Sequence, residues 1–190
     1  MLSIGMNRKL KAGNIVAYNL PARKDICGRE CPSCYAKKAQ KMYKAVLPYR
    51  ERNYQESQLP GFSAAMIAEI KGLKRAPKAI RVHESGDFYS QAYIDSWAKV
   101  ASALPGSVFY AYTKRIKEFD FSVISALPNF VIIDSCKYNA VNYGDHAFTV
   151  AMQAHGAFLC PADKVVSCGN GCDYCLDKKA QQTSVVFTKH

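Results

Sequence analysis

The sequence predicts an α/β fold, namely a partial (open) β/α barrel with a mainly parallel sheet and a cysteine-rich C-terminal segment. Three observations predict it. Segments rich in β-forming residues alternate with helical patterns, as in βαβ units. A polar or cysteine-bearing loop follows each of the first four predicted strands, and seven of the eight cysteines lie in two short stretches. We therefore expect a partial barrel over residues 1–150 that carries the first cysteine group. A cysteine-rich segment over 151–190 is expected to lie on the same domain.

The predicted elements follow one another along the chain. Strands are expected over 14–20, 79–83, 107–112 and 130–134, which are apolar runs bounded by turn residues. Helices are expected over 36–57, with an interruption near Pro48, over 62–73 and over 116–127. The helix at 62–73 is expected to place Ala65, Ile67 or Ala68, and Ile70 on its apolar side. A further helix begins after Ser90, a capping residue type, and extends toward Leu104. Short strands are expected at 147–151, 156–159 and 184–188.

Composition and charge limit the class of protein. A chain of 190 residues with 49% hydrophobic residues can bury a core without disulfides. It has neither a signal-peptide pattern nor an apolar run long enough to span a bilayer, so we expect a cytoplasmic protein without a membrane partner. Thiols stay reduced there, and clustered cysteines then favour metal binding. The net charge of +11 favours an anionic substrate or nucleic acid as partner.

The predicted parallel sheet brings four loops together. Functional loops lie beyond the carboxyl ends of parallel strands. The first loop holds the stretch CGRECPSC, which starts at Cys27, and the later loops hold residues 83–87, 113–115 and 134–136. All four carry polar or metal-binding side chains, which indicates one site at this edge of the sheet.

The first cysteine group consists of Cys27, Cys31 and Cys34. Three thiolates at this spacing can hold a 4Fe–4S cluster and leave one iron open to an external ligand. Zinc is the alternative metal, because tetrahedral zinc sites use cysteines two to four residues apart.

A strand that leads into CxxxCxxC within an α/β alternation resembles the radical S-adenosylmethionine superfamily. The resemblance implies that S-adenosylmethionine chelates the open iron and that a flavodoxin- or ferredoxin-like protein supplies electrons. The superfamily's Gly-Gly-Glu turn corresponds here to Glu84, Ser85, Gly86 and Asp87, and its aromatic residue before the third cysteine is replaced by Tyr35 after it. These residues and Lys114, which suits a phosphate or carboxylate, are the candidate cofactor-binding residues.

The second cysteine group consists of Cys160, Cys168, Cys172 and Cys175. Four thiolates can complete one metal site, either a structural zinc site or a fully ligated iron–sulfur cluster. An auxiliary cluster of this kind is also what the resemblance implies. A single site shared by both groups is the third interpretation.

Three further features remain open in function. Cys136 follows an apolar strand, which is typical of a buried packing residue. Its predicted loop also makes it the candidate catalytic residue, as a radical relay or hydrogen donor, or else a fourth metal ligand. His83 is interpreted as a metal ligand, as a hydrogen-bonding partner of a substrate, or as a structural hydrogen-bonding residue. Lysines and tyrosines interleave after the first cysteine group, which fits single-stranded nucleic acid as well as a solvated helix face. A non-enzymatic metal-stabilised nucleic-acid-binding protein is therefore the alternative to an iron–sulfur enzyme.

The chain is also similar to a family of phage-encoded proteins. The similarity lies in RVHESGDFYSQAY at 81–93, in FYAYTK at 109–114 and in the C-terminal cysteine group. It implies a phage origin, and hence the cytoplasm of the host, but no activity.

Overall fold

The computed structural model of the chain describes residues 1–2, 8–31, 34–135, 143–144, 158–161, 167–181 and 185–188. Its centre is a parallel sheet with the strand order β1 (Ile15–Tyr18), β2 (Ala79–Val82), β3 (Phe109–Thr113) and β4 (Phe130–Asp134). Each strand pairs with the next one along the chain, and the β2–β3 register places Arg81 opposite Tyr110. The predicted α/β class and parallel sheet are confirmed. The four-stranded sheet is open, with β1 and β4 at its edges, and does not close into a barrel.

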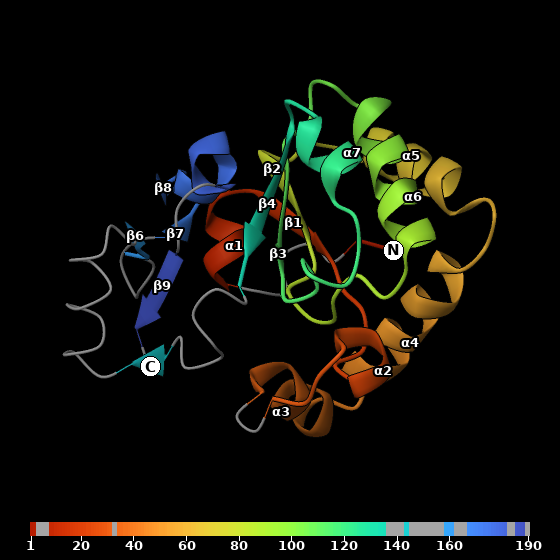
Figure 1. Ribbon diagram of the computed structural model, residues 1–190, viewed down its shortest axis with the longest axis vertical. Helices are drawn as coiled ribbons and strands as arrows, with labels where there is room; N and C mark the ends of the chain where they lie inside the picture. The colour runs from red at the N-terminus through yellow and green to blue at the C-terminus, as the bar shows by residue number, and fades with distance from the viewer. Residues whose placement is uncertain are drawn as a thin grey trace.

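One face of the sheet is covered by four helices (Figure 1), which are α4 (Val46–Ser57), α5 (Phe62–Lys71), α6 (Gln91–Ser102) and α7 (Ser122–Ala126). Trp97 of α6 is fully buried at the centre of this layer. Its ring lies 5.5 Å from that of Tyr18, 5.7 Å from that of Phe62 and 6.4 Å from that of Phe109, measured between centroids. Aromatic residues from the sheet and the helices therefore form the main core.

The second face of the sheet carries the side chains of Ile15, Ala17, Ala79, Arg81, Tyr110, Tyr112, Val131 and Ile133. It is covered by α1 (Arg8–Ala12) and by C-terminal elements, which are β7 (Ser167–Cys168), β8 (Gly171–Cys172), η1 (Tyr174–Leu176) and η2 (Lys178–Gln181). Leu10 and Ala180 are buried there, and Cys160, Cys168 and Cys175 lie against the same apolar cluster. Figure 1 shows α1 and the β7–β8 pair on the side of the sheet opposite α5 and α6.

Two short helices, α2 (Lys24–Cys27) and α3 (Tyr35–Met42), lie beyond the carboxyl edge of the sheet (Figure 1). A separate small sheet consists of β5 (Tyr143–Gly144), β9 (Val185–Thr188) and β6 (Phe158–Leu159), in that order. No helix in the described part of the chain is both long and apolar enough to cross a bilayer.

The structure corrects three of the predicted helices. The helix expected over 36–57 is divided at residues 43–45 instead of at Pro48. Pro48 is the third residue of α4, where a backbone N–H has no partner within the helix, so its absence costs little. Helix α5 buries Phe62, Met66 and Ile70, whereas Ala65 is exposed.

The helix expected over 116–127 shortens to α7, because Asp120 accepts a hydrogen bond from the Ser122 amide at 2.8 Å and starts a new turn there. Ser90 caps α6 as predicted, accepting from the Tyr93 amide at 3.3 Å. The strand expected at 147–151 lies outside the described residues.

Candidate functional site

Hydrogen bonds join the loops that leave β1 and β2. The Asn19 side-chain carbonyl accepts from the amides of Glu84 at 2.8 Å and Ser85 at 3.0 Å. The Ser85 hydroxyl donates to the Leu20 carbonyl at 2.9 Å. Gly86 has a φ of 84°, and a Cβ at this position would lie 2.5 Å from the Cβ of Leu20. Only glycine fits here, and it allows the two loops to meet.

Asp87 joins this pair of loops to the end of β3. Its Oδ1 accepts from the Thr113 hydroxyl at 2.7 Å and the Phe88 amide at 2.8 Å, and its Oδ2 accepts from the Lys114 amide at 2.9 Å. Burial raises the pKa of Asp87 to about 6, and these hydrogen bonds oppose the rise. Both carboxylate oxygens thus serve the fold, as do Ser85 and Gly86.

The loop after β3 holds the first cysteine loop in place. Arg115 donates from Nη1 to the Ile26 carbonyl at 3.1 Å. Gly28, directly after Cys27, has a φ of 71°, and a Cβ there would lie 2.8 Å from Arg115 Cδ. Arg29 donates from Nη2 to the Lys114 carbonyl at 3.0 Å. Three contacts from two successive residues of the β3 loop therefore position the cysteine loop at the carboxyl edge.

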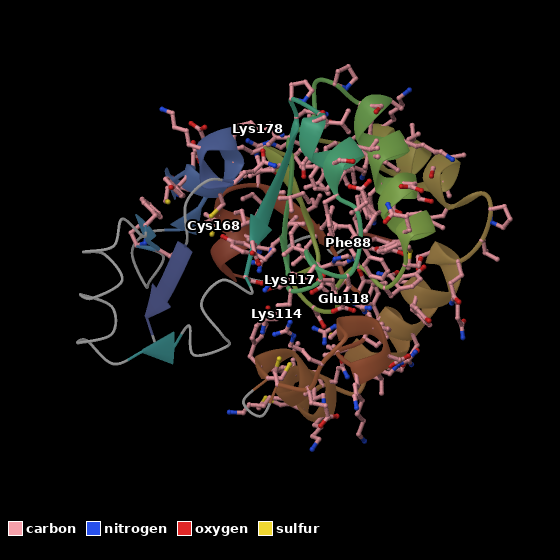
Figure 2. The ribbon with its side chains drawn as sticks, viewed as in Figure 1. Phe88, Lys114, Lys117, Glu118, Cys168 and Lys178 are labelled. Atoms are coloured by element: carbon pink, nitrogen blue, oxygen red, sulfur yellow. The ribbon has the colours of Figure 1, made fainter. Side chains whose placement is uncertain are left out.

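The thiols of Cys27, Cys31 and Cys34 are half-buried at this edge. Burial raises the pKa of Cys27 to about 12, and Asp87, Cys34 and Cys31 raise it further through their negative charge. Lys114 Nζ lies 3.5 Å from Cys31 Sγ, and Figure 2 shows Lys114 between the end of the sheet and α3. Cys27 is thus within electrostatic range of the other two thiols, and Cys31 lies beside a lysine ammonium.

Tyr35 and Glu84 also lie near the first cysteine loop. The Tyr35 hydroxyl donates to the Glu84 carbonyl, which links α3 to the β2 loop, and the Glu84 side chain is half-buried. Of the six predicted cofactor-binding residues, Tyr35, Glu84 and Lys114 lie around the cysteine loop. The other three, Ser85, Gly86 and Asp87, are used to join the loops that follow β1, β2 and β3. Among the described residues, no group of three His, Cys, Asp or Glu side chains is arranged to hold a metal ion.

The second cysteine group lies against the second face of the sheet. Cys175 Sγ and the Tyr112 hydroxyl are 2.6 Å apart. Burial raises the pKa of Cys175 to about 12, the Tyr112 contact opposes the rise, and the negative charges of Cys160 and Cys168 add to it. Cys172 is the register partner of Cys168 in the β7–β8 pair.

The two cysteine groups occupy different parts of the molecule. Figure 2 shows Cys168 beside the face of the sheet, away from α3, which follows the first group. The predicted catalytic residue Cys136 lies outside the described residues, as do residues 137–142. His83, interpreted as a ligand or a structural residue, is buried and hydrogen-bonds through Nε2 to the Tyr93 hydroxyl at 2.9 Å.

The sequence analysis missed Arg81 and Tyr110, which lie on the second face with buried polar atoms that lack hydrogen-bond partners. The available signal was a cation inside the otherwise apolar strand AIRV at 79–82. Arg115 belongs to the predicted loop 113–115, where it was expected to suit a phosphate or carboxylate, but the sequence did not indicate that it positions the cysteine loop. Among the basic residues after the first cysteine group, Arg50 is buried and donates to the Ala36 carbonyl at 3.0 Å, so it belongs to the fold.

Comparisons with known proteins identify the family. A family model described as gene product 88 matches residues 2–146. The chain belongs to the gene product 88 family. The matched range includes the first cysteine group and the segments RVHESGDFYSQAY at 81–93 and FYAYTK at 109–114, but it ends before Cys160. The predicted phage relationship is confirmed, whereas the family match does not extend to the C-terminal cysteine group.

Two curated relatives are phage proteins. The chain is 36% identical over 90 residues to the gene 88 protein of Mycobacterium phage L5 and 34% identical over 90 residues to that of Mycobacterium phage D29. Each match covers 43% of this chain and 38% of the relative. No solved structure matches the chain.

Proposed function

We propose that the chain is an iron–sulfur protein in which Cys27, Cys31 and Cys34 hold a 4Fe–4S cluster at the carboxyl edge of the sheet. The observation that supports it most is the β3 loop, which holds the three half-buried thiols of a CxxxCxxC stretch at the edge where parallel sheets carry their sites. Sulfur donors of this kind suit iron–sulfur clusters and zinc above other metals.

The number of thiols in the loop suits a cluster that has one open iron. A cubane with four irons and three protein thiolates leaves one iron for an outside ligand. In a radical S-adenosylmethionine-type enzyme, the cluster would supply the electron that cleaves the bound S-adenosylmethionine. The open parallel sheet with the strand order β1-β2-β3-β4 is the part of the α/β arrangement that such a protein would share.

Three side chains have defined tasks in this proposal. The Lys114 ammonium balances the negative charge of the cluster thiolates from its position 3.5 Å from Cys31 Sγ. The Glu84 carboxylate would accept a hydrogen bond from the cofactor's amino group. Tyr35 fixes the Glu84 backbone through its hydroxyl and so positions that carboxylate. A flavodoxin- or ferredoxin-like protein of the host cytoplasm would deliver the electron.

The second cysteine group would hold an auxiliary cluster or a zinc ion against the second face. Cys160, Cys168, Cys172 and Cys175 supply a complete set of four thiolates, and both metals accept such a set. The Tyr112 hydroxyl, 2.6 Å from Cys175 Sγ, would donate a hydrogen bond to the thiolate.

Metal analysis of the anaerobically purified protein tests the proposal. We expect brown protein with about eight irons and eight sulfides per chain if both groups hold clusters, and about four if the second holds zinc. Cys27→Ala, Cys31→Ala and Cys34→Ala should each remove about four irons and leave the metal of the second group in place. Colourless wild-type protein with zinc at both groups would refute the iron–sulfur assignment. Loss of all metal from one of these folded variants would instead show a single shared site.

A second candidate function is binding of single-stranded nucleic acid through α3 and the residues that follow it. Lys38, Lys41, Met42, Tyr43 and Lys44 are exposed there, and basic side chains beside an exposed aromatic ring suit phosphates and stacked bases. The net charge of +11 also favours it. Fluorescence anisotropy with a labelled oligonucleotide decides between the two. Binding that weakens with salt and is lost in Tyr43→Ala, at unchanged metal content, would favour the binding protein.

A further inference from the structure

Arg81 is a cation with a buried Nε that forms no ion pair with a described carboxylate. It lies in the middle of β2, and its side chain points to the second face of the sheet. Its Nε is buried without a hydrogen-bond partner, and no described carboxylate lies within ion-pair distance. The guanidinium lies over the Tyr112 ring, 5.4 Å from its centroid. That ring stabilises the charge but offers no acceptor in the plane of the guanidinium.

Tyr110 presents a second unpartnered group next to Arg81. The two residues are register partners on β2 and β3, and both project from the second face. Tyr110 is 2% exposed, and its hydroxyl is buried without a hydrogen-bond partner. Burial raises the pKa of this hydroxyl, so it remains a neutral donor.

The surroundings act on Arg81 only through their charge: burial lowers the pKa of its guanidinium, and the Glu84 carboxylate is among the groups that raise it, without forming an ion pair with it. On its other side in the sheet the register partner is Ala17, which contributes only a methyl group. The nearby His83 is kept neutral, because burial and then the charge of Arg81 lower its pKa to about 3. A guanidinium is always charged in proteins, and leaving one buried and unpaired is costly. An anionic ligand would supply the direct partner that the Arg81 guanidinium lacks.

We propose that Arg81 and Tyr110 form a binding site for the oxyanion group of a small ligand, either a carboxylate or a phosphoryl group. The planar guanidinium can donate two parallel hydrogen bonds to such a group, and the Tyr110 hydroxyl can donate a third. Arg81 as a whole is only half-buried, so a small ligand can reach it. The position on the face of the sheet, next to the buried Tyr110, suits a small molecule and not a polymer. The site goes beyond the proposed function, because neither Arg81 nor Tyr110 is a proposed metal ligand, although the charge of Arg81 also acts on Cys175.

Titration of the purified full chain with inorganic phosphate and with acetate tests the proposal. Thermal unfolding at constant ionic strength gives the affinity for each anion, and the two probes separate the phosphoryl from the carboxylate specificity. We expect millimolar binding of at least one probe. Arg81→Met should weaken it at least tenfold, and Tyr110→Phe should weaken it by about threefold to tenfold. Arg52→Met removes an exposed arginine of α4 and should leave the affinity unchanged.

A second readout does not depend on the ligand. Because Arg81→Met removes a buried Nε that has no hydrogen-bond partner, it should raise the melting temperature of the ligand-free protein, whereas loss of a structural arginine would lower it. The proposal would be overturned if neither phosphate nor acetate binds up to about 50 mM. It would also be overturned if Arg81→Met and Arg52→Met bind with equal affinity. If Arg81→Met does not fold, the affinity of Tyr110→Phe decides. Binding that is weakened as predicted would support the proposal, and binding equal to that of wild type would overturn it.

Discussion

Gly13→Ala tests how the second cysteine group is attached to the sheet. Gly13 lies between α1 and β1, and a Cβ there would lie 1.8 Å from the Cys168 carbonyl oxygen and 2.8 Å from its carbonyl carbon. Both are backbone atoms, which cannot rotate away as the end of a side chain would. The methyl group therefore has to displace the β7–β8 turn from α1.

The magnitude follows from two opposing effects. Overpacking of this kind costs about 1–3 kcal/mol, and the backbone contact puts Gly13→Ala near the upper end. Replacement of glycine by alanine also restricts the unfolded chain, which stabilises by about 0.4–1 kcal/mol. We expect a net destabilisation of about 1–2.5 kcal/mol.

Gly106→Ala is the matched control, because a Cβ there meets nothing within 4 Å and should leave only the stabilising effect. The difference between the two variants equals the steric cost, about 2–3 kcal/mol, which corresponds to about 4–12 °C in melting temperature for a chain of this size. Calorimetry or circular dichroism measures it. Equal melting temperatures for the two variants would show that Cys168 does not lie against Gly13.

Three further variants test the carboxyl edge. Lys114→Met removes the cation beside Cys31, so the reduction potential of the first cluster should become more negative, and an unchanged potential in a redox titration would contradict that contact. His83 has a pKa of about 3, below its ordinary value of 6.5, so the native state binds fewer protons than the unfolded state between these values. Its neutral form therefore favours folding above about pH 6.5, and up to about 4–5 kcal/mol is lost as the pH falls toward 3. The difference in unfolding free energy between wild type and His83→Asn should change with pH in that window and be flat above it. Arg115→Lys should loosen the cysteine loop, because lysine cannot reproduce the contact with the Ile26 carbonyl, and the variant should lose iron to a chelator faster than wild type.

The strands were predictable from sequence because their side chains are buried whichever way the helices lie. The run FVIID at 130–134 is recognisable as a strand by its apolar residues alone. The α3–α4 break was not predictable in this way. A proline signals a break only where its missing N–H matters, and Pro48 falls in the first turn of α4.

The candidate site was only partly predictable for a different reason. The spacing of Cys27, Cys31 and Cys34 identifies the donors, and the strand order brings Lys114 beside them. The roles of Asp87 and Arg115 depend on contacts between loops far apart in sequence, such as that from Thr113 to Asp87, which no local pattern encodes. Arg81 needed the register with Tyr110 before the missing partner of its Nε could be recognised.

Electron paramagnetic resonance of the reduced protein, with and without S-adenosylmethionine, tests the central claim most directly. If Cys27, Cys31 and Cys34 hold a cluster with one open iron, the added compound should change the spectrum, because an outside ligand alters the symmetry of that iron. Glu84→Ala should weaken this change about tenfold to a hundredfold in the concentration required, through loss of one charge-assisted hydrogen bond. A spectrum that stays the same at millimolar S-adenosylmethionine would contradict the account, because the fourth position of the cluster would then be filled by the protein itself.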